Sequence, residues 1–256
     1  MRNWIMLKPF VKIVVFTNSV EDTQYLISMG VLVQPVSHLR AGEAPILRWM
    51  FEEIDKIAQT PLRGYINSDI LFTDDLIHAL DLIMNAMNMA QPFMAVGRRT
   101  NILAVTETEA QSFAKIKLAA KARGELFWTN AEDFFITNAA YPWKNIMDVV
   151  IGRPVYDNWI VAHSICDLQI DVIDVSGTIL AVHQSTTSGG NKEGFKHEQA
   201  KYNLKMFDDM DINGVDFDRG KTDCTQWRTI LDFCGQLKLV QRVDFPDHCV
   251  CVKKYS

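Results

Sequence analysis

The amino-acid sequence predicts one α/β domain with a mostly parallel central sheet, helices on both faces and a small C-terminal appendage. Short β-branched segments alternate with segments whose apolar residues recur at the helical period, which is typical of strand–helix–strand units. A length of 256 residues suits one large domain. Apolar residues make up 48% of the chain and charged residues 22%, so the composition is that of a folded protein and excludes wholesale disorder.

In the first half of the chain, β-branched runs mark strands, and turn residues mark where they end. Residues 12–16 form the first expected strand, which Thr17-Asn18-Ser19 closes because these side chains favour turns and helix caps. Gly30 ends the helix that follows. The expected elements here are strands at 12–16, 31–36, 62–66 and 93–96, and helices at 20–29, 44–58, 76–89 and 110–122.

The second half continues the alternation and then changes character. The expected elements are strands at 134–137, 169–175 and 178–182 and helices at 156–165 and 198–207. Segment 185–196 is rich in Ser, Thr, Gly and Asn and is expected to be a mobile lid. Beyond about residue 214, turn residues precede apolar segments at 227–233, 238–245 and 249–252. We expect residues 1–213 to carry binding and catalysis, and residues 214–256 to pack on them or to form a homo-oligomer interface.

The charge balance excludes a general nucleic-acid binder. The net charge is −5 and the pI is about 5.7, whereas a nucleic-acid backbone is bound by a basic surface. We therefore expect no nucleic-acid partner. An anionic ligand would have to be held locally, by a few cations or by a metal ion.

The N-terminal region carries no pattern of a membrane span or a secretory signal. Lys8, Pro9 and Lys12 interrupt its apolar residues, so no run approaches the roughly 20 apolar residues that cross a bilayer. No small-residue cleavage site follows. These features predict a cytoplasmic protein with no transmembrane segment.

The cysteine count predicts reduced thiols. An odd number of cysteines without a signal peptide is typical of a reducing compartment. Cys249 and Cys251 are separated by one residue, which is not a standard zinc spacing, so no metal site is expected there. The five residues are Cys166, Cys224, Cys234, Cys249 and Cys251.

Polar side chains follow several expected strands, at the point where each strand ends. Ligands of parallel α/β sheets bind beyond the carboxyl ends of the strands, so these side chains are expected to meet around one ligand. The clusters are Thr17-Asn18, Asn67-Ser68-Asp69, Arg98-Arg99 and His183-Gln184.

The Asn67-Ser68-Asp69 cluster carries the clearest motif. A carboxylate at the end of a buried strand is costly unless it is paired or bound to a cation, and its oxygens suit Mg²⁺ or Mn²⁺. A turn-capping role for Asp69 is the alternative. The stretch GYINSDILFTDDLIHAL resembles the strand–DxD–helix segment of GT-A-type glycosyltransferases, in which the triplet holds the metal ion that bridges the diphosphate of a nucleotide sugar. Asn67 replaces the first Asp of that triplet, so only the carboxylate of Asp69 remains.

Asp157 is the candidate catalytic residue. Ile151-Gly152-Arg153-Pro154 forms a tight loop, and Asp157-Asn158 begins the next expected helix. A helix N-cap is the structural alternative for Asp157. In GT-A enzymes an acidic residue in this context often deprotonates the acceptor hydroxyl, and the resemblance therefore implies a direct, inverting displacement. The helix N-terminus is expected to keep Asp157 ionised.

His183 follows an apolar strand and precedes the expected lid. A lone histidine at a strand end is commonly a satisfied structural residue. GT-A-type enzymes often carry a late histidine that completes the metal shell, and the resemblance assigns that role to His183 together with Asp69. The order of Asp69, Asp157 and His183 matches the family, and the resemblance covers roughly residues 12–207.

The remaining candidates have equally plausible structural roles. Arg98 and Arg99 are expected to hold phosphate or sugar hydroxyls, or else to pair with a nearby acid. Thr17 and Asn18 lie where this fold usually contacts the nucleotide base. On the acceptor side we expect Asp133, Arg153 and Trp159, although Asp133 and Arg153 could simply pair and Trp159 could belong to the core.

The sequence therefore predicts a GT-A-like glycosyltransferase that uses Mn²⁺ or Mg²⁺. The donor would be a nucleotide sugar, most simply a UDP- or GDP-sugar, and the acceptor a hydroxyl of a glycan or another molecule. One alternative is a nucleotidyltransferase acting on sugar phosphates, although the acidic segment after the first strand does not suit it. A second alternative is a sugar- or nucleotide-binding module that has lost catalysis, which the Asn67 substitution favours.

Overall fold

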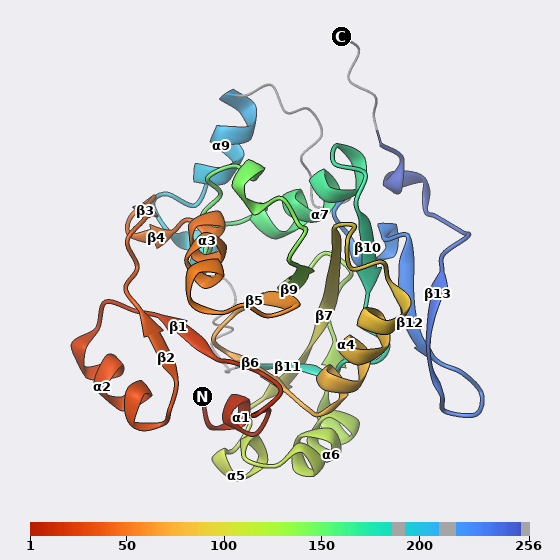
Figure 1. The fold of residues 1–256 in the computed structure, drawn as a ribbon, viewed down its shortest axis with the longest axis horizontal. Helices are drawn as coiled ribbons and strands as arrows, with labels where there is room; N and C mark the ends of the chain where they lie inside the picture. Colours follow the sequence, from red (N-terminus) through yellow and green to blue (C-terminus); the bar gives the residue numbers. More distant parts are fainter. Residues whose placement is uncertain (186–192, 210–218, 252–256) are drawn as a thin grey trace.

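A computed structural model describes residues 1–185, 193–209 and 219–251. These residues form one nine-stranded sheet, two small two-stranded sheets and a set of short helices (Figure 1). The strands are β1 Val14–Phe16, β2 Leu32–Gln34, β3 Leu39–Arg40, β4 Ala44–Pro45, β5 Leu62–Ile66, β6 Ile70–Phe72, β7 Phe93–Leu103, β8 Glu125–Leu126, β9 Glu132–Asn138, β10 Asp171–Asp174, β11 Ala181–Ser185, β12 Trp227–Leu231 and β13 Leu237–Gln241.

The helices connect these strands as the alternating pattern predicts. The α-helices are α1 Arg2–Ile5, α2 Val20–Ser28, α3 Leu47–Ile57, α4 Asp75–Ala86, α5 Glu107–Ala110, α6 Phe113–Arg123, α7 Tyr156–Cys166, α8 Glu193–Lys196 and α9 Tyr202–Asp209. Short 3₁₀ turns lie at η1 Trp143–Asn145, η3 Thr222–Cys224 and η4 Asp247–Cys249. Among the described residues, no helix has both the length and the hydrophobicity needed to cross a membrane.

The α/β class is confirmed, but the large sheet is mixed rather than mostly parallel. Its main strand order is β13-β12-β10-β7-β11-β6, and β5, β8 and β9 pair off this path. Only the pairings β10–β12, β10–β7 and β11–β7 are parallel. The other pairings are antiparallel, chiefly because β9 returns beside β5 and β7 in the opposite direction. A strand pairing between distant segments does not change the local alternation of strands and helices, so the sequence pattern could not predict this antiparallel arrangement.

Strand β7 separates two hydrophobic cores. Met94 and Val96 pack in one core with residues of α3 and α7. Phe93 and Ala95 pack in the other core with residues of α4. Because successive side chains of a strand point to opposite faces, helices cover both faces of the sheet here. This part of the predicted architecture agrees with the structure.

A β-bulge at Gly97 lets β7 change partners along its length. The register with β9 shifts between Val96 and Arg98. Before the bulge β7 pairs with β10, and after it β7 pairs with β11. A Cβ atom at Gly97 would lie 2.6 Å from the Cζ atom of Phe134, so only glycine fits without a shift of the ring.

We expect Gly97→Ala to lower the free energy of unfolding by about 1–3 kcal/mol, because the added methyl overpacks this core. Urea denaturation measures the change. Phe134→Leu removes the ring atoms that a methyl at position 97 would strike, so the cost of Gly97→Ala should be smaller in that background. An equal cost in both backgrounds would show that the ring contact is not the reason for glycine.

The first strand does not join the large sheet. β1 and β2 form a separate parallel pair, with α2 connecting them. Ile13, Leu26 and Val31 make a small core of their own beneath this pair. Thus the β1–α2–β2 unit is a satellite of the nine-stranded sheet, rather than its first two strands.

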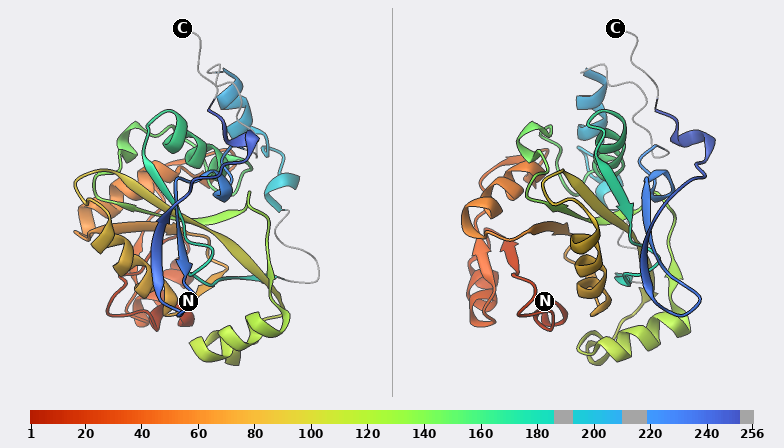
Figure 2. Two further views of the ribbon diagram at one scale, coloured as in Figure 1. Left: turned by 90° about the vertical axis from the view of Figure 1, so that its right-hand side faces the viewer. Right: turned by 45° about the vertical axis from the view of Figure 1, so that its right-hand side comes forward.

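The C-terminal segment extends the large sheet. β12 pairs in parallel with β10, and β13 closes an antiparallel hairpin at the sheet edge (Figure 2). The expected domain boundary near residues 213 and 214 lies outside the described residues. In the apolar segment at 249–252, Cys249 ends the 3₁₀ turn η4, and residue 252 is not described.

Two disulfide bonds correct the expectation of reduced thiols. Cys166 at the end of α7 is bonded to Cys251, and Cys224 in η3 is bonded to Cys249 in η4. Cys234 is an exposed free cysteine. The cysteine count did not reveal these pairings because the bonded residues are 85 and 25 positions apart and meet only in the folded chain.

Candidate functional site

Asp69 and His183 meet at one edge of the large sheet. β6 begins directly after Asp69, and β11 pairs with it so that His183 lies opposite Ile70. The Nε2 atom of His183 lies 2.9 Å from the Oδ2 atom of Asp69. The histidine side chain is only 6% exposed, whereas that of Asp69 is 48% exposed. The carboxylate is therefore accessible from solvent while the imidazole is fixed behind it.

Hydrogen bonds orient both members of this pair. Burial alone would raise the pKa of Asp69, but the hydrogen bond from His183 and the nearby Arg99 charge outweigh it and lower that pKa. The other imidazole nitrogen, Nδ1, lies 3.0 Å from the Oγ atom of Ser185. The backbone amide of Gln184 donates to the carbonyl oxygen of Asp69 at 3.2 Å. Asp69 is thus held as a carboxylate.

Asp69 and His183 offer one oxygen and one nitrogen that could hold a divalent cation. The 2.9 Å separation of Nε2 and Oδ2 is that of a hydrogen bond. Adjacent ligands of a six-coordinate ion with bonds of about 2.1 Å also lie about 3 Å apart, so a cation could replace the shared proton without moving either side chain. One oxygen and one nitrogen donor suit Mn²⁺ better than Mg²⁺, which prefers oxygen. Asn67 contributes nothing to this set, because its amide is engaged elsewhere.

Asn67 belongs to a hydrogen-bond network with Asp133. Its Nδ2 atom donates to the Oδ1 atom of Asp133 at 2.8 Å, and its Oδ1 atom accepts from the hydroxyl of Tyr65 at 2.7 Å. The backbone amide of Asn67 also donates to the carbonyl oxygen of Asp133. An amide can satisfy a donor and an acceptor at once, whereas a carboxylate here would face Asp133 with like charge. The hydrogen bonds to Tyr65 and Asp133 therefore explain why an Asn occupies the position of the motif's first Asp.

A buried ion pair lies next to this network. Nη1 of Arg99 donates to both carboxylate oxygens of Asp133, at 2.9 and 3.0 Å. The two side chains are about one-tenth exposed, at 10% and 9%. The guanidinium also lies 4.5 Å from the ring centroid of Phe127. Arg99 is an interior residue of β7 rather than a strand-end residue, because β7 continues to Leu103.

Asp157 lies in the first turn of α7, directly after a strained residue. Val155, the N-cap, has φ of 76°, a left-handed conformation that is rare for a β-branched residue and recurs at functional sites. The Oδ1 atom of Asp157 accepts from the amide of Asn158 at 3.0 Å. Since the N-cap position belongs to Val155, Asp157 is not the N-cap of α7.

The pKa of Asp157 differs from the expectation. Although part of the residue is accessible to solvent, burial of its carboxyl raises the pKa to about 7, and the negative charge of Asp133 adds to the rise. Hydrogen bonds from the helix N-terminus lower the pKa but do not outweigh burial. The prediction that the helix end keeps Asp157 ionised is therefore corrected. A carboxyl with this pKa can take up and release a proton near neutral pH.

Glu132 and Tyr65 are site residues that sequence reasoning did not select. Glu132 is 1% exposed, and its Oε2 atom accepts from Nδ2 of Asn158 at 2.9 Å. Burial and the Asp157 charge raise the pKa of Glu132 well above its ordinary value. Burial also raises the pKa of Tyr65, and the charges of Asp133, Asp69 and Asp157 add to that rise.

These electrostatic couplings place the acidic groups in one neighbourhood. The charges of Asp69, Asp133 and Asp157 each raise the pKa of Tyr65, although these residues come from the turn after β5, from β9 and from α7. The Glu132-Asp133 pair at the start of an apolar strand was the available sequence signal for Glu132. It could not reveal that the helix carrying Asp157 packs against it.

Several predicted ligand-binding residues lie in other environments. The amide of Asn18 exchanges two hydrogen bonds with the backbone of Val36, and the hydroxyl of Thr17 accepts from the amide of Ser19. The guanidinium of Arg98 donates to the carbonyl oxygen of Phe127. The structure therefore uses the polar groups of these residues in local contacts, and Arg98 and Arg99 do not form a joint clamp. Ser68 is exposed beside Asp69.

Two of the three predicted acceptor-binding residues also lie away from the candidate site or are buried in the core. Arg153 donates to the carbonyl oxygens of Gly152 and Ala41, at 2.8 and 2.7 Å, instead of pairing with Asp133. Trp159 is 2% exposed and belongs to the core, so it cannot stack on a sugar. Asp133 remains in the site. The predicted lid at 185–196 falls largely on residues 186–192, which lie outside the described residues.

A cavity of about 420 Å³ lies elsewhere, between α4, the loop at residues 176–180 and the β12–β13 hairpin. Its lining includes Asp75, His78, Thr178 and Leu237, and no residue of the Asp69 neighbourhood. The candidate site is therefore defined by its side-chain contacts rather than by a cavity.

The chain matches no protein-family model, no curated protein and no solved structure. The site's geometry and the motif around Asp69 are consequently the support for a function.

Proposed function

We propose that this protein is a metal-dependent glycosyltransferase that moves a sugar from a nucleotide diphosphate sugar to an acceptor hydroxyl. The contact between Asp69 and His183 carries the proposal, because it joins two far-separated residues that the motif order had already paired. An accessible carboxylate backed by a fixed imidazole is a donor set for a divalent cation. The cation would be Mn²⁺ or Mg²⁺.

The proposal assigns a role to each of the protein groups. Asp69 and His183 would hold the cation, which when bound supplies charge neutralisation for the leaving diphosphate. Asp157 would accept the proton of the attacking hydroxyl, which implies inversion at the anomeric carbon. The buried Arg99–Asp133 pair would hold these side chains in place, and the guanidinium of Arg99 lowers the pKa of both Asp69 and Asp157.

A binding module without catalysis is the second candidate, and one observation favours it. Asn67 replaces a carboxylate and is fully engaged with Tyr65 and Asp133, so, within the part of this site that the structure describes, the cation would have Asp69 and His183 alone as ligands. Hydrolysis or transfer of a donor sugar distinguishes the two, because a binding module turns nothing over.

The decisive test is a thermal-shift screen of UDP-, GDP-, CMP- and dTDP-sugars, each with Mn²⁺ or with a chelator. A donor present at about 100 times its dissociation constant should raise the melting temperature by about 5–10 °C. The shift should require the metal and should be lost in Asp69→Ala and in His183→Ala. The exposed Asp81 of α4 offers a matched control, since Asp81→Ala should keep the full shift. If no donor shifts the wild-type protein, the proposed function is wrong.

A further inference from the structure

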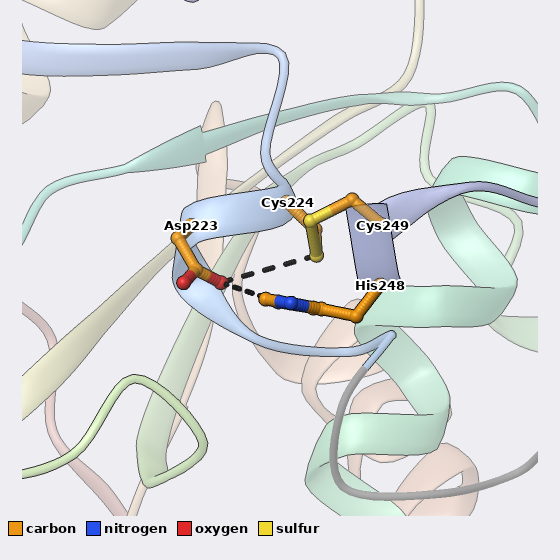
Figure 3. Close-up of side chains that lie close together, drawn as sticks. All are labelled: Asp223, Cys224, His248 and Cys249. Atoms are coloured by element: carbon orange, nitrogen blue, oxygen red, sulfur yellow. Dashed lines mark hydrogen bonds and ion pairs between the residues drawn. A yellow bond between two sulfur atoms is a disulfide. The ribbon is translucent and has the colours of Figure 1, made fainter. Parts of the chain in front are cut away.

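A second group of metal-ligating side chains lies at the base of the C-terminal hairpin. The turns η3 and η4 face each other there, and each contributes two adjacent residues (Figure 3). Asp223 and Cys224 come from η3, and His248 and Cys249 come from η4. None of the four belongs to the Asp69 neighbourhood, so this cluster is independent of the proposed glycosyltransferase site.

The spacing of these atoms is close to that around a tetrahedral ion. One ligand atom from each residue lies within 4.8 Å of all the others. The Nε2 atom of His248 is 3.3 Å from the Oδ1 atom of Asp223, which in turn is 3.9 Å from the Sγ atom of Cys224. Tetrahedral zinc bonds of about 2.0–2.3 Å separate such nitrogen, oxygen and sulfur ligands by about 3.3–3.6 Å.

The largest departure from such a site is the pair of sulfur atoms. They are joined in a disulfide bond in the structure, whereas two zinc-bound thiolates lie about 3.8 Å apart and are not bonded to each other. Breaking the disulfide would free the two sulfur atoms to move apart toward this separation. The side chains of these two residues are 29% and 32% exposed, which leaves a path for an ion to reach the buried Cys224.

We propose that the reduced protein binds Zn²⁺ through Asp223, Cys224, His248 and Cys249. A dithiol reduces the disulfide to two thiols and is itself oxidised to a disulfide. The two thiols then lose their protons as Zn²⁺ binds, and a neutral imidazole and a carboxylate complete the shell. Two thiolates with an imidazole select zinc over Mg²⁺ or Ca²⁺.

The disulfide in the oxidised protein and the zinc ion in the reduced protein would cross-link the same two turns, η3 and η4. The disulfide spans 25 residues that include the whole β12–β13 hairpin. Zinc would join the same two turns when the disulfide is absent, so the base of the hairpin would stay closed under oxidising and reducing conditions alike. The cross-link is covalent in one state and depends on metal in the other.

Cobalt(II) provides the direct test, because thiolate ligands give it a sulfur-to-metal charge-transfer band that oxygen and nitrogen ligands do not. The full chain carrying Asp69→Ala is used, so that the candidate donor site does not compete. After reduction with dithiothreitol and its removal under nitrogen, one equivalent of Co²⁺ should produce the band, and Zn²⁺ should abolish it. The oxidised protein should show no band.

Two kinds of variant keep the test valid if one fails to fold. Cys249→Ser should remove the band, whereas Cys234→Ser, at an exposed free cysteine, should retain it. His248→Ala leaves the disulfide intact, so it can be folded in the oxidised state and then reduced, and its Co²⁺ affinity should fall at least about tenfold. The proposal is overturned if the reduced protein shows no band, if the oxidised protein shows the same band, or if His248→Ala binds as tightly as its parent.

Discussion

Asp157→Asn should lower the rate of sugar transfer by about 10²–10⁴-fold, because an amide cannot accept the proton of the acceptor hydroxyl. The amide keeps the shape and the hydrogen bond from the backbone of Asn158. Donor affinity should therefore be nearly unchanged. Initial rates with the donor found in the thermal-shift screen, together with its melting shift, measure both quantities.

The wild-type rate should also depend on pH with a midpoint near 7. Burial raises the pKa of Asp157 to about that value, and the base works only when it is deprotonated. The rate should therefore rise with pH through the midpoint. The Asp157→Asn variant should lack this rise.

Stability should change with pH in the opposite sense. Between the unfolded pKa of about 3.8 and the folded value of about 7, the folded protein holds a proton on Asp157 that the unfolded chain has released. The Asp157 contribution to stability therefore falls as pH rises through this window. Relative to wild type, Asp157→Asn should be more stable at pH 8 than at pH 4.

Asp167→Asn is the matched control, since Asp167 caps the other end of α7 and pairs with His163. It should retain transfer activity. If Asp157→Asn loses donor binding and stability together with activity, Asp157 is a structural residue of the helix start and the catalytic role is excluded.

Local sequence signals predicted much of the chain's secondary structure. The strand at 62–66 and the helix beginning at residue 156 were placed at the observed starts, because a β-branched or apolar run was bounded by turn residues. The mixed topology was missed because it depends on β9 pairing between β5 and β7, which is a long-range contact. The predicted strand at 93–96 was too short because Gly97, Arg98 and Arg99 were taken to end it. In the structure β7 passes through a bulge at Gly97 and continues to Leu103.

The sequence predicted contacts within the candidate site only where the order of the motifs indicated which residues would meet. Asp69 and His183 were paired by their order along the chain, and the structure brings them into contact. Glu132 was missed because its raised pKa arises from burial against α7, which no local pattern encodes. The prediction that Trp159 binds the acceptor was wrong. The sequence does not show whether an aromatic side chain near a site faces solvent or the core, and Trp159 faces the core.

Arg99→Met should lower the free energy of unfolding by about 3–5 kcal/mol, because it leaves the Asp133 carboxylate buried without its ion-pair partner. Methionine matches the length of the arginine stem, so the loss would reflect charge more than volume. Urea denaturation measures it. The positive charge of Arg99 also lowers the pKa of Asp157, so the pH midpoint of any remaining activity should move upward.

Two further variants decide whether the unpaired charge causes this loss. Adding Asp133→Asn to Arg99→Met removes the buried charge and should recover part of the stability, since an amide can still bond to Asn67. Arg123→Met breaks a pair with Glu109 at the surface and should have a much smaller effect, because water already screens that pair. If Arg99→Met lowers the free energy of unfolding no more than Arg123→Met does, the buried Arg99–Asp133 pair does not stabilise the site. The pairing of β5 with β9 would then be what holds Asn67 beside Asp133.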